Sequence, residues 1–112
     1  MQNHAKILWT TDNKETAINM ICLYAHNAKK QGWIENVTIL IWGASQTLVS
    51  QDKDIQEKIK AMIDDGVEVI ACKKCAENVG VVEDLEDCGI NIFYTGQLLS
   101  AWIMSKDTVI TI

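Results

Sequence analysis

The sequence predicts a three-layer α/β/α fold, in which helices cover both faces of a mainly parallel five-stranded sheet. Five short apolar runs alternate with stretches of helical periodicity along the 112 residues. This alternation is typical of strand–helix–strand units, whose crossover connections make neighbouring strands parallel. The length is that of one domain, so we expect residues 1–112 to form a single domain.

The first strand and the first helix have clear signals. Residues 5–9 (AKILW) are the first apolar run. Asp12 is the expected N-cap of the following helix, with Glu15 three residues later as its capping-box partner. Apolar residues at helical spacing continue this helix to about residue 31, and Gly32 is expected to end it.

The rest of the chain repeats the alternation. The run VTILIW is apolar throughout, which is typical of a strand buried on both faces of a sheet. The further expected elements are, in order, a strand at 37–42, a short helical turn at 46–49, a helix at 53–64, a strand at 67–71, short helices after residue 72 and at 82–88, a strand at 90–94, a helix from Thr95 to about residue 106 and a strand at 108–112.

Composition and charge argue against several classes of function. The net charge is −5 and the lysines are scattered, so no basic face for nucleic acid is expected. No apolar run approaches the ~20 residues of a membrane span, and the N-terminal segment lacks a signal-peptide core. We therefore expect a cytoplasmic protein with reduced thiols. No glycine-rich phosphate loop is present, so no cofactor is expected.

A parallel sheet binds its ligands beyond the carboxyl ends of its strands. This rule gathers the residues that follow each predicted strand along one edge of the sheet. The expected ligand pocket consists of Trp9, Thr10, Trp42, Gly43, Ser45, Lys73, Tyr94 and Gly96, and Cys72 lies at the same edge.

Cys72 is the strongest candidate for chemistry. It follows the third predicted strand and precedes a helix, where unpaired backbone N–H groups favour an anion such as a thiolate or a persulfide. Lys73 and Lys74 add positive charge nearby. The alternative is a structural cysteine, because free cysteines are commonly buried.

Cys75 follows Cys72 with the C-x-x-C spacing of thiol–disulfide oxidoreductases. Cys75 could resolve a persulfide or sulfenic acid on Cys72, or it could pack beneath the helix. The pair supplies too few ligands for a closed zinc site, even with Cys88 as a third, so no metal is expected within one chain. A site shared between subunits stays open. Cys22 and Cys88 are expected to be packing residues.

The stretches IWGAS, ACKKCAENVGV and FYTGQLLSAWIMSKDTVITI resemble the DsrE/DsrF-like family of small α/β proteins. The resemblance is carried by the Trp-Gly exit of the second strand, the cysteine ending the third, a glycine eight residues later and the Tyr-x-Gly before the last helix. It implies a DsrE/F-like fold and sulfur handling, because family members carry sulfur as a cysteine persulfide. Cys72 and Gly80 match the relay cysteine and its glycine, whereas Cys75 stands where relay members have a small residue.

The resemblance also implies a homo-oligomer, as a trimer or a hexamer. A hydrophobic share of 48% in so short a chain agrees with apolar surface buried between subunits.

Three functions follow from these observations. The first is a sulfur carrier or sulfurtransferase subunit that holds sulfane sulfur as a persulfide on Cys72, with donor and acceptor proteins as partners. The second is an oligomeric module that binds a small ligand or acts as a scaffold, without catalysis. The third is a dithiol redox protein with a reversible bond between Cys72 and Cys75.

Overall fold

The computed structural model describes residues 3–112, and its five strands form one sheet in the order β4-β3-β2-β1-β5. All four strand pairings are parallel, which confirms the predicted α/β class and makes the sheet fully parallel. The strands are β1 (His4–Trp9), β2 (Asn36–Ile41), β3 (Glu68–Cys72), β4 (Asn91–Phe93) and β5 (Val109–Thr111).

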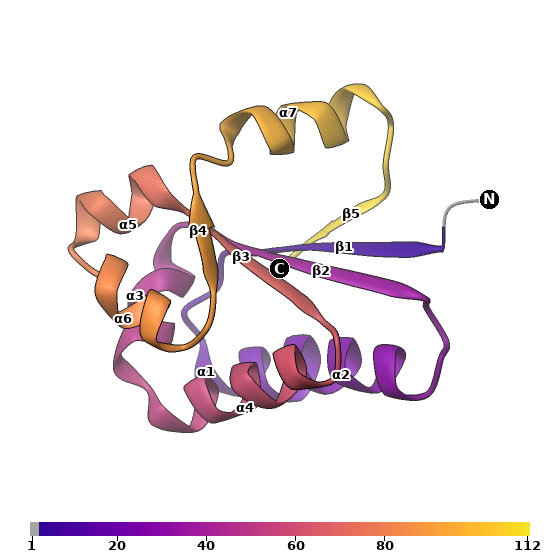
Figure 1. Cartoon of the computed structure of the whole chain (residues 1–112), viewed down its shortest axis with the longest axis horizontal. Coiled ribbons are helices and arrows are strands. Elements are labelled where there is room, and N and C mark those ends of the chain that lie inside the picture. Colours follow the sequence, from indigo (N-terminus) through magenta and orange to yellow (C-terminus); the bar gives the residue numbers. More distant parts are fainter. Residues whose placement is uncertain (1–2) are drawn as a thin grey trace.

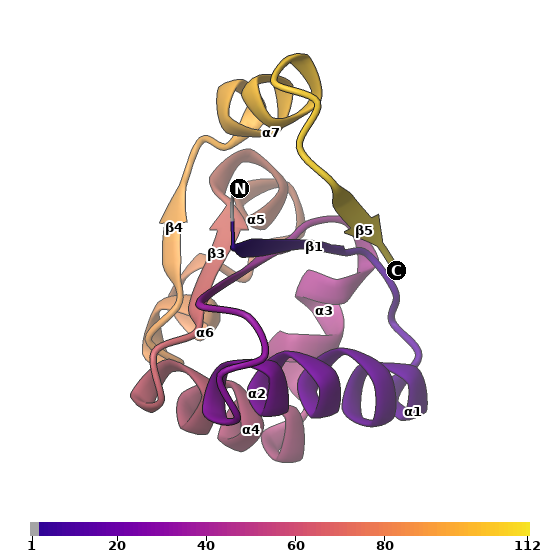
Figure 2. The same cartoon turned by 90° about the vertical axis from the view of Figure 1, so that its right-hand side faces the viewer.

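The helices cover the two faces of the sheet unequally. Figures 1 and 2 show α7 alone on one side and α1, α2 and α4 on the other. Among residues 3–112, no helix is both long enough and apolar enough to cross a membrane. The helices are α1 (Lys14–Thr16), the π-helical η1 (Ala17–Cys22), α2 (Leu23–Lys30), α3 (Ala44–Gln51), α4 (Lys53–Asp64), α5 (Lys73–Val79), α6 (Val82–Asp87) and α7 (Gly96–Met104).

Two apolar clusters hold these layers together. The larger cluster joins alternate strand residues to the helices, with Trp9, Ile39 and Val69 from the sheet and Ile21 and Ile59 from η1 and α4. The smaller cluster lies beneath α7, and its buried members are Leu40, Ile70 and Trp102. Because successive strand side chains point to opposite faces, β3 contributes Val69 to one cluster and Ile70 to the other.

The start of the first helix differs from the prediction. Asp12 is not the N-cap: the cap is Asn13, whose side chain accepts a hydrogen bond from the Thr16 N–H at 2.8 Å. The helix begins one residue later than expected, so Glu15 cannot complete a capping box with Asp12. The middle of this helical stretch is π-helical, which the spacing of apolar residues did not indicate.

Several other boundaries also move. Strands β2 and β3 each match the predicted runs to within one residue, and β3 includes Cys72. The expected short turn at 46–49 is a longer helix, α3. Strands β4 and β5 are shorter than predicted, with 3 residues each. Thr95 occupies the N-cap position of α7, but its side chain makes no capping hydrogen bond.

Candidate functional site at the carboxyl edge of the sheet

Cys72 is both the last residue of β3 and the N-cap of α5. It pairs in register with Phe93 of β4 and lies two residues after Ile70. Side-chain alternation therefore directs Cys72 toward the α7 face of the sheet. Only 3% of its surface is exposed, so its sulfur is covered by the surrounding protein.

Cys75 lies one helical turn further along and is half-buried. Its Sγ accepts a hydrogen bond from the backbone N–H of Gly43 at 3.3 Å. Gly43 has φ of 76°, in the left-handed region that favours glycine, and nothing lies within 4 Å of where a Cβ would stand. Gly43 is therefore suited to this position by backbone conformation, and that conformation directs an N–H group at the sulfur of Cys75.

The side chain of Gln46 links the ends of β2 and β3 by hydrogen bonds. Its side chain is fully buried, and its Nε2 donates to the carbonyl oxygens of Ile41 at 3.1 Å and Cys72 at 3.0 Å. These carbonyls lie at the last residues of β2 and β3, so Gln46 fixes the backbone of Cys72 relative to β2. Sequence reasoning missed Gln46, although it lies three residues before Val49 on the buried side of α3.

Two buried oxygen atoms near this edge have no hydrogen-bond partner within the described chain: Gln46 Oε1 and Thr95 Oγ1. Gln46 reaches Cys72 through its other amide atom, and Thr95 follows β4 directly. Buried polar atoms without a partner are uncommon in folded proteins. Both of them lie in segments that follow the carboxyl ends of strands.

Trp9, Thr10, Trp42 and Ser45 meet at the ends of β1 and β2. The Ser45 hydroxyl lies 2.6 Å from the carbonyl oxygen of Trp9 and 3.0 Å from that of Trp42. Trp9 is fully buried in the larger cluster, whereas the indole of Trp42 packs partly buried against the smaller one. The Thr10 hydroxyl donates to the carbonyl oxygen of Ile112 at 3.1 Å. These contacts stabilise the strand ends.

A charged rim extends over α5 and the end of β4. Lys73 Nζ lies 5.4 Å from the centroid of the Tyr94 ring. The Tyr94 hydroxyl donates to the two carboxylate oxygens of Glu77 at 3.2 and 3.1 Å, and this hydrogen bond raises the pKa of Tyr94. The sequence did not single out Glu77. Gly96 lies beyond this rim, where α7 begins.

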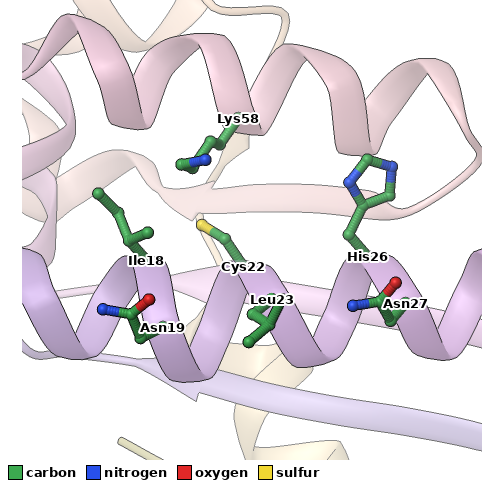
Figure 3. Close-up of a pocket in the computed structure, with 7 residues that line it drawn as sticks. All are labelled: Ile18, Asn19, Cys22, Leu23, His26, Asn27 and Lys58. Carbon is green, nitrogen blue, oxygen red and sulfur yellow. The ribbon is translucent and has the colours of Figure 1, made fainter.

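The other two cysteines lie away from this edge. Cys22 lines a pocket of about 330 Å³ between η1, α2 and α4, and Figure 3 shows its sulfur pointing toward the helix that carries Lys58. Burial raises the pKa of the Cys22 thiol to about 11, and Lys58 opposes this shift. Burial also raises the pKa of Cys88. Both are buried packing residues, as predicted.

His26 lines the same pocket as Cys22 and lies with its Nε2 2.6 Å from Asp65 Oδ2. All four cysteines are free thiols. Within the described residues 3–112, no three His, Cys, Asp or Glu side chains lie close enough to hold a metal ion.

Comparisons with known proteins agree on one family and one fold. The model of the DsrE/DsrF-like family matches residues 10–112. A conserved protein of unknown function from Bacteroides thetaiotaomicron is 38% identical, with 98% of this chain and 95% of that chain covered and a TM-score of 0.96. No curated protein matches the chain.

Two more distant structures share the fold alone. A protein of unknown function from Methanobacterium thermoautotrophicum is 13% identical, with 97% of each chain covered and a TM-score of 0.70. The ychN protein from E. coli is 18% identical, with 100% of each chain covered and a TM-score of 0.68.

Proposed function

This chain belongs to the DsrE/DsrF-like family, and from that premise we propose that it is a sulfur carrier or sulfurtransferase subunit. In this proposal, Cys72 holds sulfane sulfur as a persulfide. The observation that supports this proposal is that two free thiols, Cys72 and Cys75, lie at the carboxyl edge of a parallel sheet. Ligands bind at this edge in open α/β folds.

The chemistry needs only thiol exchange. A thiolate attacks the outer sulfur of a donor persulfide, the donor's sulfur–sulfur bond breaks, and the donor leaves as a thiolate. An acceptor thiolate then attacks the outer sulfur of the cysteine persulfide and regenerates the cysteine thiolate. Because no electrons are gained or lost overall, the cycle suits a reducing compartment such as the cytoplasm, where we expect the protein to act.

The surroundings of Cys72 support a carrier that shields its persulfide sulfur from solvent. Cys72 is almost fully covered, and Gln46 fixes its backbone through a buried hydrogen bond. A persulfide exposed to solvent would transfer its outer sulfur to any small thiol in solution. A covered persulfide reacts only with a partner that reaches it. The expected partners are therefore sulfur donor and acceptor proteins, and nucleic acid is not among them.

We also propose that the chain forms a homo-oligomer. Ile103 and Met104 on α7 are 65% and 81% exposed, although both side chains are large and apolar. Large apolar side chains exposed together mark surfaces that contact another protein. The family resemblance favours a trimer or a hexamer.

The carrier proposal is tested by mass spectrometry after incubation with glutathione persulfide and removal of excess donor. Trypsin cuts after Lys73 and Lys74, so Cys72 and Cys75 fall in separate peptides. We expect one added sulfur atom per wild-type chain, found at equilibrium on the Cys72 peptide. The double variant Cys72→Ser/Cys75→Ser should gain none, because it lacks both thiols at the sheet edge.

The double variant Cys22→Ser/Cys88→Ser is the matched control. It keeps the sheet-edge pair and removes the other two cysteines, so it should load like the wild type. A wild-type protein that gains no sulfur, or a Cys72→Ser/Cys75→Ser variant that still gains it, would show that the carrier proposal is wrong.

A further inference from the structure

We propose that Cys75 is the thiol that first receives sulfur from an external donor, and that it passes this sulfur to Cys72. The inference rests on the proposed sulfur-carrier function and assigns the order of events at its site. It divides the two cysteines into an outer receiving thiol and an inner holding thiol.

Exposure distinguishes the two sulfurs. A donor must bring its outer sulfur into bonding contact with the attacking thiolate, and so must reach it from solvent. Cys72 is 3% exposed, whereas Cys75 is half-buried and therefore partly open to solvent. Within this chain, a donor meets Cys75 before it meets Cys72.

The backbone of Gly43 holds Cys75 at this edge. Its N–H donates to Cys75 Sγ at 3.3 Å, and its carbonyl oxygen accepts from the same sulfur at 3.9 Å. Cys75 is also the third residue of α5, and no such side-chain hydrogen bond is found for Cys72 in the described chain. The position of the outer sulfur is thus fixed by the backbone that follows β2.

The two cysteines have a spacing that permits transfer between them. Cys72 is the N-cap of α5 and Cys75 is its third residue. Both cysteines therefore belong to the first turn of the same helix. Two cysteines three residues apart at a helix start are the arrangement in which thiol exchange is well known.

The transfer consists of two balanced exchanges. The Cys75 thiolate attacks the outer sulfur of an organic persulfide, which breaks the donor's sulfur–sulfur bond and releases an organic thiolate. The Cys72 thiolate then attacks the outer sulfur of the Cys75 persulfide. This second step breaks the bond between the two sulfurs on Cys75, forms the Cys72 persulfide and returns the Cys75 thiolate.

The rim around α5 suits a donor with negative charge. Lys74 is exposed beside Cys75, and Lys73 is held over the Tyr94 ring, which is itself bonded to Glu77. Glutathione persulfide carries carboxylates and an ionisable persulfide, so it is an appropriate probe.

The experiment follows the added sulfur over time on the separate tryptic peptides of Cys72 and Cys75, and repeats the measurement in Cys22→Ser/Cys88→Ser because the peptide 75–106 also contains Cys88. In the wild type, sulfur should appear first on the Cys75 peptide and later on the Cys72 peptide. Cys72→Ser should keep its sulfur on Cys75. Cys75→Ser should slow loading by about tenfold or more, because the covered Cys72 must then react with the donor directly. Far-UV circular dichroism checks that each variant folds.

Two results would overturn the inference and leave the carrier proposal standing. One is a Cys75→Ser variant that loads Cys72 at the wild-type rate. The other is wild-type sulfur that appears on Cys72 without passing through Cys75. A third result, wild-type sulfur that stays on Cys75, would overturn both the transfer step and the proposal that Cys72 holds the persulfide. If neither the wild type nor Cys22→Ser/Cys88→Ser loads at all, the carrier proposal itself fails.

Discussion

At the scale of single residues, the four cysteines take different positions in this fold. Cys72 could be placed from the sequence because the apolar run before it ends abruptly, and strand ends meet at one edge of a parallel sheet. The sequence left open whether Cys72 is buried, and the hydrogen bond from Gly43 to Cys75 could not be predicted, because both depend on how α5 packs beside the end of β2. Gln46 was missed because a buried amide looks like a surface residue in a sequence.

The stability of the protein should fall as pH rises from 9 to 11, and Cys22 should cause part of this fall. Burial raises the pKa of Cys22 from 9.0 to about 11 in the folded state. Between these values the unfolded chain releases the thiol proton and the folded chain keeps it, so rising pH favours unfolding. The stabilisation is complete below pH 9 and is lost as pH passes through about 11. The difference amounts to about 2–3 kcal/mol.

Urea unfolding, followed by tryptophan fluorescence across this pH range, would measure the effect. Cys22→Ala should be less stable at neutral pH because it leaves a small cavity, yet its stability should decline less steeply with pH. Equal slopes in the two proteins would show that Cys22 titrates normally in the folded state.

At the scale of elements, apolar runs predicted the central strands β1, β2 and β3 well, since these lie in the interior of a parallel sheet, whereas the exposed edge strands β4 and β5 are shorter than their runs. The π-helical turn Ala17–Cys22 and the true length of α3 were not predictable. Both depend on packing against neighbouring elements, and local propensity does not encode that packing. The same holds for Asn13, because Asp12 and Asn13 are equally good N-cap residues by type.

One buried ion pair joins β1 to the connection between α7 and β5. Lys6 Nζ lies 2.8 Å from Asp107 Oδ2 and 5.8 Å from the centroid of the Trp102 ring. Asp107→Asn should lower the free energy of unfolding by about 3 kcal/mol, because it leaves a buried ammonium group without its counter-charge. The double variant Lys6→Met/Asp107→Asn should recover part of this loss, since no buried charge is left.

Chemical denaturation of the three proteins would test this ion pair. Asp54→Asn is the matched control, because Asp54 pairs with Lys14 on the surface and its removal should cost much less than the loss of the buried pair. If Asp107→Asn costs no more than Asp54→Asn, the buried pair does not stabilise this connection.

At the scale of the whole molecule, the two faces of the sheet are unequal. Several helices cover the face of the larger cluster, whereas α7 alone covers the other (Figure 2). The sequence predicted the layers, and its high apolar content indicated apolar surface buried between subunits. It could not show which apolar residues remain exposed, because core and surface positions of the same residue type look alike. The structure locates several of them on and beside α7, namely Phe93, Tyr94, Ile103 and Met104.

Charged substitutions on α7 should dissociate the proposed oligomer without unfolding the chain. Ile103→Glu/Met104→Glu would place two charges on an apolar surface that we expect to lie between subunits, where an unpaired charge is costly to bury. Size-exclusion chromatography with light scattering should show an oligomer for the wild type and a monomer for this variant. Far-UV circular dichroism should remain unchanged, because both residues are exposed in the single chain.

Trp33→Glu is the matched control, because Trp33 is 62% exposed but lies in the segment after α2 and beside Leu23 and Tyr24 of that helix, in the layer on the other side of the sheet. It should keep the wild-type mass. A wild-type monomer, or an Ile103→Glu/Met104→Glu variant that keeps its mass, would rule out α7 as the interface. Since α7 begins at Gly96, two residues after Tyr94 of the charged rim, an interface on α7 would place a second subunit beside the sulfur site. Dissociation should then also change the rate at which a donor loads Cys75.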